Sequence, residues 1–99
     1  MKHYTARTDF KQAVADAANG GQALFTHNWG MATGSKCFHG AKVIGKLFDQ
    51  NARRLEETAR ALGVRRVKID RRDHPWQHVD LVGKPLERAI AMASEEGRP

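Results

Sequence analysis

The sequence predicts a small α/β or α+β domain in which a single-layer sheet of four or five strands packs with three helices. Apolar residues recur at helical spacing in three segments, and β-prone runs of strand length lie between them. The 99 residues suffice for one modest core. We therefore expect one domain over residues 1–99, with the element order β-α-β-(loop)-α-β-β-α.

The first helix is predicted to follow Asp9, which offers an N-cap. Apolar residues then recur at helical spacing as far as Ala17, and Asn19-Gly20-Gly21 supplies a stop. Before this helix the run KHYTA alternates well enough for a short strand. After it the run QALFT is β-prone and has the length of a buried strand.

The second helix is predicted from apolar residues that fall on one helical face between Val43 and Leu62, with Gly63 placed as its C-terminal cap. Its start is ambiguous. It begins either near Ala41 or only after a short AKVIG strand, because Gly45 inside a helix costs about 1 kcal/mol relative to alanine. We favour the early helical start.

The C-terminal third is predicted to add two strands and a helix. VRRVKID is typical of a strand with a basic outward face, RRDHP of a turn and WQHVDLV of the next strand. Lys84-Pro85 then opens the last helix, because proline is tolerated in a first turn. Its expected buried residues are Leu86, Ile90 and Ala93.

Charge is the broadest signal of function. Lysine and arginine number 17 against 11 acidic residues, which gives a net charge of +6 and favours polyanionic partners such as nucleic acid or nucleotides. Solubility is the alternative reason for such a charge. We expect a cytoplasmic protein without a membrane partner, since no apolar run approaches about 20 residues and MKHYTARTDF lacks a signal-like stretch.

The basic residues concentrate before and within the predicted RRDHP turn. A tryptophan follows them, and arginine is suited to bidentate phosphate contacts while tryptophan stacks on bases. Interleaved Asp70 and Asp73 argue instead for an ordinary solvated face. The candidate phosphate-binding residues here are Arg65, Arg66, Lys68, Arg71, Arg72 and Trp76.

The stretch GMATGSK lies in a glycine-rich segment that is predicted to be a long loop. It resembles a phosphate-binding P-loop, but its glycines are too close, serine precedes lysine and no partner carboxylate follows an apolar strand. We therefore exclude NTP hydrolysis. A looser anion nest from Gly34, Ser35 and Lys36 remains a candidate beside the alternative of a simple turn.

Candidate catalytic residues are few. Cys37 and His39 would share one face of an extended segment, but a buried core thiol is the commoner role for a lone cysteine. His78 and Asp80 share a strand face at about 7 Å and suit acid/base or metal chemistry, with a structural hydrogen bond as the alternative. His74 lies about 13 Å from His78 in a strand, too far to share an ion, so we predict no metal site and no cofactor.

Three short motifs follow one another in the C-terminal half: Ala-x-x-Leu-Gly at residues 59–63, His-Val-Asp-Leu at residues 78–81 and Arg-Ala-Ile at residues 88–90. This combination resembles a small bacterial and phage family of unknown function whose strand reads His-Tyr-Asp-Leu. Val79 stands where that family usually has tyrosine. The resemblance implies a bacterial or phage protein and brings no activity with it.

These observations favour a small basic module that binds phosphate-bearing ligands, either nucleic acid or nucleotide, without catalysis. The first alternative is a phage or mobile-element accessory protein that binds a host protein complex, with exposed tryptophans as anchors. The second is a small hydrolase or transferase that uses His39, His78 and Asp80.

Overall fold

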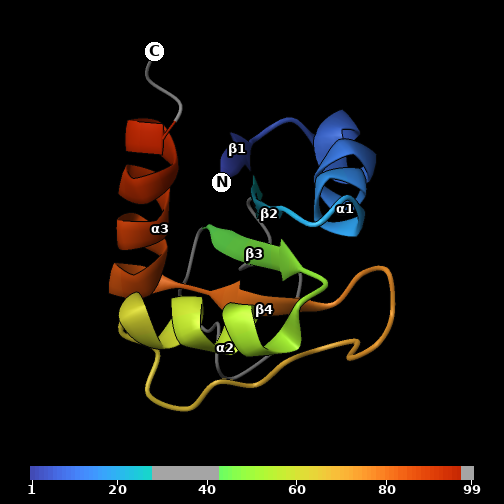
Figure 1. Cartoon of the computed structure of the whole chain (residues 1–99). Coiled ribbons are helices and arrows are strands. Elements are labelled where there is room, and N and C mark those ends of the chain that lie inside the picture. The colour runs from blue at the N-terminus through green and yellow to red at the C-terminus, as the bar shows by residue number, and fades with distance from the viewer. Residues whose placement is uncertain (28–42, 97–99) are drawn as a thin grey trace.

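The computed structural model describes residues 1–27 and 43–96, so the predictions for Gly34, Ser35, Lys36, Cys37 and His39 lie outside the described residues. Figure 1 shows the element order. The elements are β1 (Lys2–Tyr4), the 3-10 helix η1 (Arg7–Asp9), α1 (Phe10–Ala18), β2 (Gln22–His27), β3 (Ile44–Asp49), α2 (Ala52–Ala61), β4 (His78–Leu81) and α3 (Gly83–Glu96).

The four strands form one mixed sheet in the order β1-β2-β3-β4. β1 is parallel to β2, whereas β2 with β3 and β3 with β4 are antiparallel. Leu24, Leu47 and Val79 stand opposite one another across the two antiparallel pairings, β2 with β3 and β3 with β4. The predicted fold class, a small sheet packed with three helices, is confirmed.

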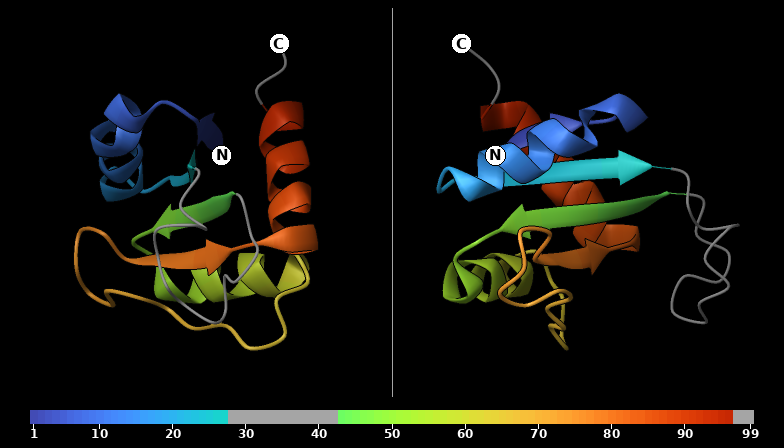
Figure 2. Two further views of the ribbon diagram at one scale, coloured as in Figure 1. Left: turned by 180° about the vertical axis from the view of Figure 1, so that it is seen from behind. Right: turned by 90° about the vertical axis from the view of Figure 1, so that its right-hand side faces the viewer.

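The helices cover both faces of the sheet, as Figure 1 and the two views of Figure 2 show. Helix α1 lies on one face, where Ala13 and Ala17 allow close packing on Phe25 and Phe48. Helices α2 and α3 pack on the other face around Leu24, Leu47, Leu55 and Leu86 and their neighbours. Within the described residues, no helix is long and apolar enough to cross a membrane.

The face that carries α1 also carries polar residues at the β3–β4 end. Lys46 is opposite Asp80 and Phe48 is opposite His78, so these four side chains leave the sheet on the same side. Helix α1 packs mainly on β2 and β3, and the segment 70–77 passes beside β4. This end of the sheet therefore holds polar groups between a helix and an irregular segment.

The early start predicted for the second helix is wrong, because Ile44–Asp49 is strand β3. β3 is buried on both faces between two neighbouring strands, so its apolar residues do not alternate and mimic a helical stripe. Helix α2 begins only after Asn51, whose side chain accepts a hydrogen bond from the Arg54 amide at 3.0 Å.

The strand predicted over VRRVKID is also wrong, since only Asp70 pairs with the sheet, through an isolated bridge to His78. Val64, Val67 and Ile69 are instead half-buried against the core formed by α2 and α3. Gly63 does cap α2 as predicted: its φ is 102°, and the Val64 amide bonds the Ala59 carbonyl at 3.0 Å.

The predicted terminal helices are confirmed, with one difference in capping. Asp9 directly precedes α1, but its side chain makes no capping hydrogen bond, and the one-turn helix η1 leads into α1 instead. In α3, Leu86 and Ala93 are buried as predicted, and Ile90 is half-buried against the core. Ala89 completes the buried face.

Candidate anion pocket beside strands β3 and β4

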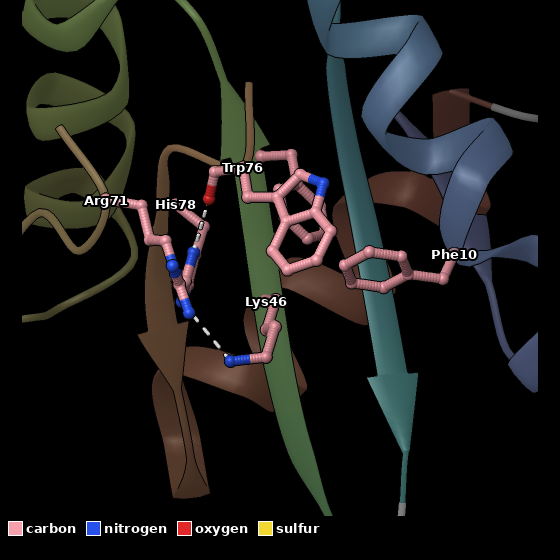
Figure 3. Close-up of a pocket in the computed structure, with 6 residues that line it drawn as sticks. Phe10, Lys46, Arg71, Trp76 and His78 are labelled. Carbon is pink, nitrogen blue, oxygen red and sulfur yellow. Dashed lines mark hydrogen bonds between the residues drawn. The ribbon is translucent and has the colours of Figure 1, made fainter. Parts of the chain in front are cut away.

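A pocket of about 170 Å³ opens at the β3–β4 end of the sheet. This volume corresponds to about six water molecules and is below the roughly 300–1,000 Å³ of drug-sized sites, so it suits one ring or one phosphate group. Figure 3 shows aromatic and cationic side chains around it. The lining residues are Phe10, Lys46, Phe48, Arg71, Trp76 and His78.

Aromatic rings form one wall of the pocket. The ring of Phe10, at the start of α1, meets the Trp76 ring edge-on with centroids 5.3 Å apart and the Phe48 ring at 5.5 Å. Trp76 remains 42% exposed although it takes part in this cluster. An aromatic surface of this kind, half in contact with protein and half open, is available for stacking.

Cationic groups face the aromatic wall. The guanidinium carbon of Arg71 lies 5.4 Å from the centre of the Trp76 ring, within the range of a cation–π contact. Lys46 extends from β3 toward His78 in the same pocket (Figure 3). The pocket therefore combines a π surface with two positive charges.

An irregular turn presents Arg71 and Trp76. Arg71 and Asp73 both adopt positive φ, at 56° and 64°, which is uncommon for residues other than glycine. Gln77, only 1% exposed, secures the turn from inside: its Nε2 donates to the Asp49 carbonyl at 2.8 Å, and its Oε1 accepts from the Asp73 amide at 2.9 Å. Gln77 thus joins the turn to the end of β3.

Replacing Gln77 with alanine is expected to lower the free energy of unfolding by about 1–3 kcal/mol, because the buried Asp49 carbonyl and the partly buried Asp73 amide lose their partner. The amide of Asp73 should also exchange faster with solvent, since its acceptor is gone. Urea denaturation and amide hydrogen exchange measure the two effects. Gln12→Ala, which removes an exposed helical hydrogen bond, is the control; equal stability of the two variants would contradict this role.

A charged cluster adjoins the pocket. Lys46 Nζ lies 3.0 Å from Asp80 Oδ1 and 3.2 Å from His78 Nε2. Burial alone would raise the pKa of the Asp80 carboxyl, but hydrogen bonds from His78 and Lys46 outweigh it and hold that pKa well below its usual range. Asp80 is therefore a carboxylate at neutral pH.

His78 is oriented by the backbone. Its Nδ1 lies 2.6 Å from the Trp76 carbonyl oxygen, which can only accept, so Nδ1 carries a proton. In the neutral ring Nε2 then accepts from Lys46 Nζ, whereas donation to Asp80 Oδ1, 3.4 Å away, requires a proton on Nε2 as well. Asp70 adds a second carboxylate, with Oδ2 at 3.9 Å from Nε2.

The structure brings together part of the predicted set. Arg71, Trp76 and His78 line one pocket, and Asp80 lies behind it as the pairing of strand faces predicted. Arg65, Arg66, Lys68 and Arg72 are exposed but do not line this pocket. His74 is separate from the cluster and accepts a hydrogen bond from the Trp76 amide.

The sequence reasoning did not assign Phe10, Lys46, Asp70 or Gln77 to the site. From the sequence, Phe10 was interpreted only as an apolar residue of the first helix. Asp70 was interpreted as an acidic residue that weakens the case for anion binding. A lysine inside the apolar run IGKLF was the one usable signal, because a charge within a buried strand needs a partner.

No protein-family model, curated protein or solved structure matches this chain. The resemblance of the C-terminal half to a bacterial and phage family therefore stays a prediction.

Proposed function

We propose that this protein is a non-catalytic binding module for phosphate-bearing ligands, nucleic acid or nucleotide, and that the pocket takes one base or one phosphate group of the ligand. The observation that supports this most is the placement of Arg71 and Trp76 against each other at the mouth of a pocket that also contains Lys46. Stacking and phosphate recognition are thereby available within one small volume.

The aromatic wall supplies the sequence-independent part of the binding energy. A base stacked on an aromatic side chain contributes about 1–3 kcal/mol by alanine substitution. The Trp76 ring is held edge-on by Phe10, so its orientation is set before a ligand arrives. A preorganised ring loses little entropy on binding.

The cations supply the phosphate contacts. Arg71 is exposed and presents a guanidinium fork suited to bidentate contact with a phosphate, whereas Lys46 lines the same pocket but already pairs with Asp80 at 3.0 Å. The exposed Arg72 adjoins Arg71 along the chain, and the net charge of +6 steers anions toward the surface.

The test is fluorescence anisotropy with a labelled single-stranded oligonucleotide. Affinity should fall steeply between about 50 and 200 mM salt through counterion release. Trp76→Ala should weaken binding by roughly 5- to 150-fold, the equivalent of about 1–3 kcal/mol. Arg71→Ala should weaken binding to all sequences alike and reduce the salt dependence.

Arg53→Ala is the matched control, because Arg53 is an exposed arginine on α2 that pairs with Glu57 away from the pocket. It removes the same charge from the net total. The proposal fails if Arg71→Ala and Trp76→Ala bind no more weakly than Arg53→Ala, or if binding is insensitive to salt.

A protein partner is the second candidate, and the exposed Trp76 beside Arg71 favours it, since interface hot spots are enriched in these two residue types. Two results together would support this candidate over the first. Oligonucleotide binding would be absent or unaffected by Trp76→Ala, and the same substitution would abolish binding of a protein partner.

A further inference from the structure

We propose that Asp70, His78 and Asp80 form a binding site for one divalent transition-metal ion of the Zn²⁺ type. One ligand atom from each side chain lies within 4.8 Å of the other two. The site adjoins the pocket, since His78 also lines it, but metal binding is measured without nucleotide, so the inference does not depend on the proposed function.

The spacing of the ligand atoms matches metal coordination. At metal–ligand distances of about 2.0–2.2 Å, neighbouring ligand atoms in a tetrahedral or octahedral site lie about 3–3.6 Å apart. His78 Nε2 lies 3.4 Å from Asp80 Oδ1 and 3.9 Å from Asp70 Oδ2. The three ligand atoms span up to 4.8 Å, so the one-third exposed Asp70 side chain has to move toward His78 and Asp80 to complete the set.

The backbone holds the three residues in register. His78 and Asp80 are two residues apart on one face of β4. Asp70 pairs with His78 through two backbone hydrogen bonds, at 2.8 and 3.0 Å. Strand β4 and the segment bridged to it at Asp70 therefore position the ligands before an ion arrives, which lowers the entropic cost of binding.

The imidazole is prepared for a metal. Metal-binding histidines commonly donate their second ring N–H to a carbonyl or carboxylate, which fixes the tautomer and the ring plane. His78 does this through Nδ1 and the Trp76 carbonyl, and its side chain is only 8% exposed. Its Nε2 faces both carboxylates, and an ion bound between them would take the Nε2 lone pair in place of a proton.

Charge defines the ion. Two carboxylates and a neutral imidazole balance a dication, and the imidazole favours Zn²⁺, Co²⁺ or Ni²⁺ over Mg²⁺ and Ca²⁺, which prefer all-oxygen sites. Three protein ligands leave positions for water, as in catalytic rather than structural zinc sites. The prediction of no metal site was based on the distance between His74 and His78. In the structure the third ligand beside His78 and Asp80 is Asp70 and not His74.

Ammonium groups compete for the same atoms. Lys46 Nζ contacts two of the three ligand atoms, and the exposed Lys68 Nζ lies 3.8 Å from Asp70 Oδ1. An ion that binds here displaces Lys46 from Asp80 and His78. Removing the Lys46 charge should therefore tighten metal binding, an effect of opposite sign to ligand removal.

The experiment titrates Co²⁺ alone, without nucleotide, into the untagged protein carrying Cys37→Ser, so that no thiolate contributes. Visible absorption reports the ligand field and calorimetry reports affinity and stoichiometry. One ion per chain is expected, with Asp70→Asn weakening binding at least tenfold. Lys46→Met should bind more tightly, and His74→Ala, a nearby exposed histidine, should bind like the parent.

Two results would overturn the site: unchanged affinity in Asp70→Asn, or no gain in Lys46→Met. Circular dichroism tests whether each variant keeps the fold. If an aspartate variant does not fold, Lys46→Met still tests the site. Since no nucleotide is present, failure here leaves the salt and Arg71→Ala tests of the proposed function standing.

Discussion

Asp49→Ala is expected to lower the free energy of unfolding by about 2–4 kcal/mol, because it removes one partner of a buried ion pair. The Asp49 side chain is 0% exposed at the end of β3. Both of its oxygens accept from Arg54 at 2.7 Å, and further bonds come from the Asn51 amide and Gln22 Nε2. No other carboxylate in the described residues is so enclosed.

The effect extends beyond the pair. Arg54 also donates to the Gly20 carbonyl at 2.8 Å, so the guanidinium joins the turn between α1 and β2 to the corner between β3 and α2. Arg54 is 42% exposed, however, and solvent screens its part of the interaction. We therefore expect about 2–4 kcal/mol rather than the roughly 3–5 kcal/mol lost when a fully buried pair is broken.

Urea denaturation measures the loss, and Arg53→Ala serves as its control. The Arg53–Glu57 pair also lies on α2, but its side chains are 90% and 66% exposed, so its removal should cost less than about 0.5 kcal/mol. A loss for Asp49→Ala no larger than that of Arg53→Ala would show that the corner is held by packing alone.

The same carboxylate predicts a dependence of stability on pH. Burial by itself would raise the pKa of Asp49. Hydrogen bonds from Arg54, Asn51 and Gln22 lower it by more than burial raises it, so the pKa in the folded state lies below the usual 3.8. The stabilisation is complete above the unfolded pKa and is lost as the pH falls through the folded pKa. Asp49→Asn should flatten the acid limb of the stability profile relative to the parent protein.

Gly45→Val should lower the free energy of unfolding by about 1–3 kcal/mol through overpacking. A Cβ at Gly45 would clash with Leu86 Cδ1 and lie 3.3 Å from Leu24 Cδ1. Gly45 lies in the interior of β3, where α3 approaches the sheet, and all three residues are buried. The strand has glycine here because the helix leaves no room for a side chain.

A double-mutant cycle with Leu86→Ala checks this explanation by urea denaturation. Leu86→Ala alone should destabilise the protein by leaving a cavity. In the Gly45→Val background it also relieves the clash. The free energies of unfolding lost in the two single variants should therefore sum to more than the loss in the double variant. Strict additivity would mean that the valine is accommodated without contact with Leu86.

The missed strand β3 and the missed site residue Lys46 have one cause. Ile44, Leu47 and Phe48 fall at helical spacing, and only pairing with strands on both sides reveals that this apolar run is a central strand. The same pairing puts Lys46 opposite Asp80. Because residues 43–48 were expected to be helical, the pairing of Lys46 with Asp80 could not be predicted.

Local pattern by itself determined the mixed α/β class, the helices α1 and α3, the Gly63 cap and the shared face of His78 and Asp80, because each depends on neighbours within a few residues. Tertiary structure alone decided the rest. Strand register joined Lys46 to Asp80, helix packing brought Phe10 to Trp76, and a bridge outside any strand brought Asp70 to His78. Such contacts link residues far apart along the chain, and only burial of one common core brings them together.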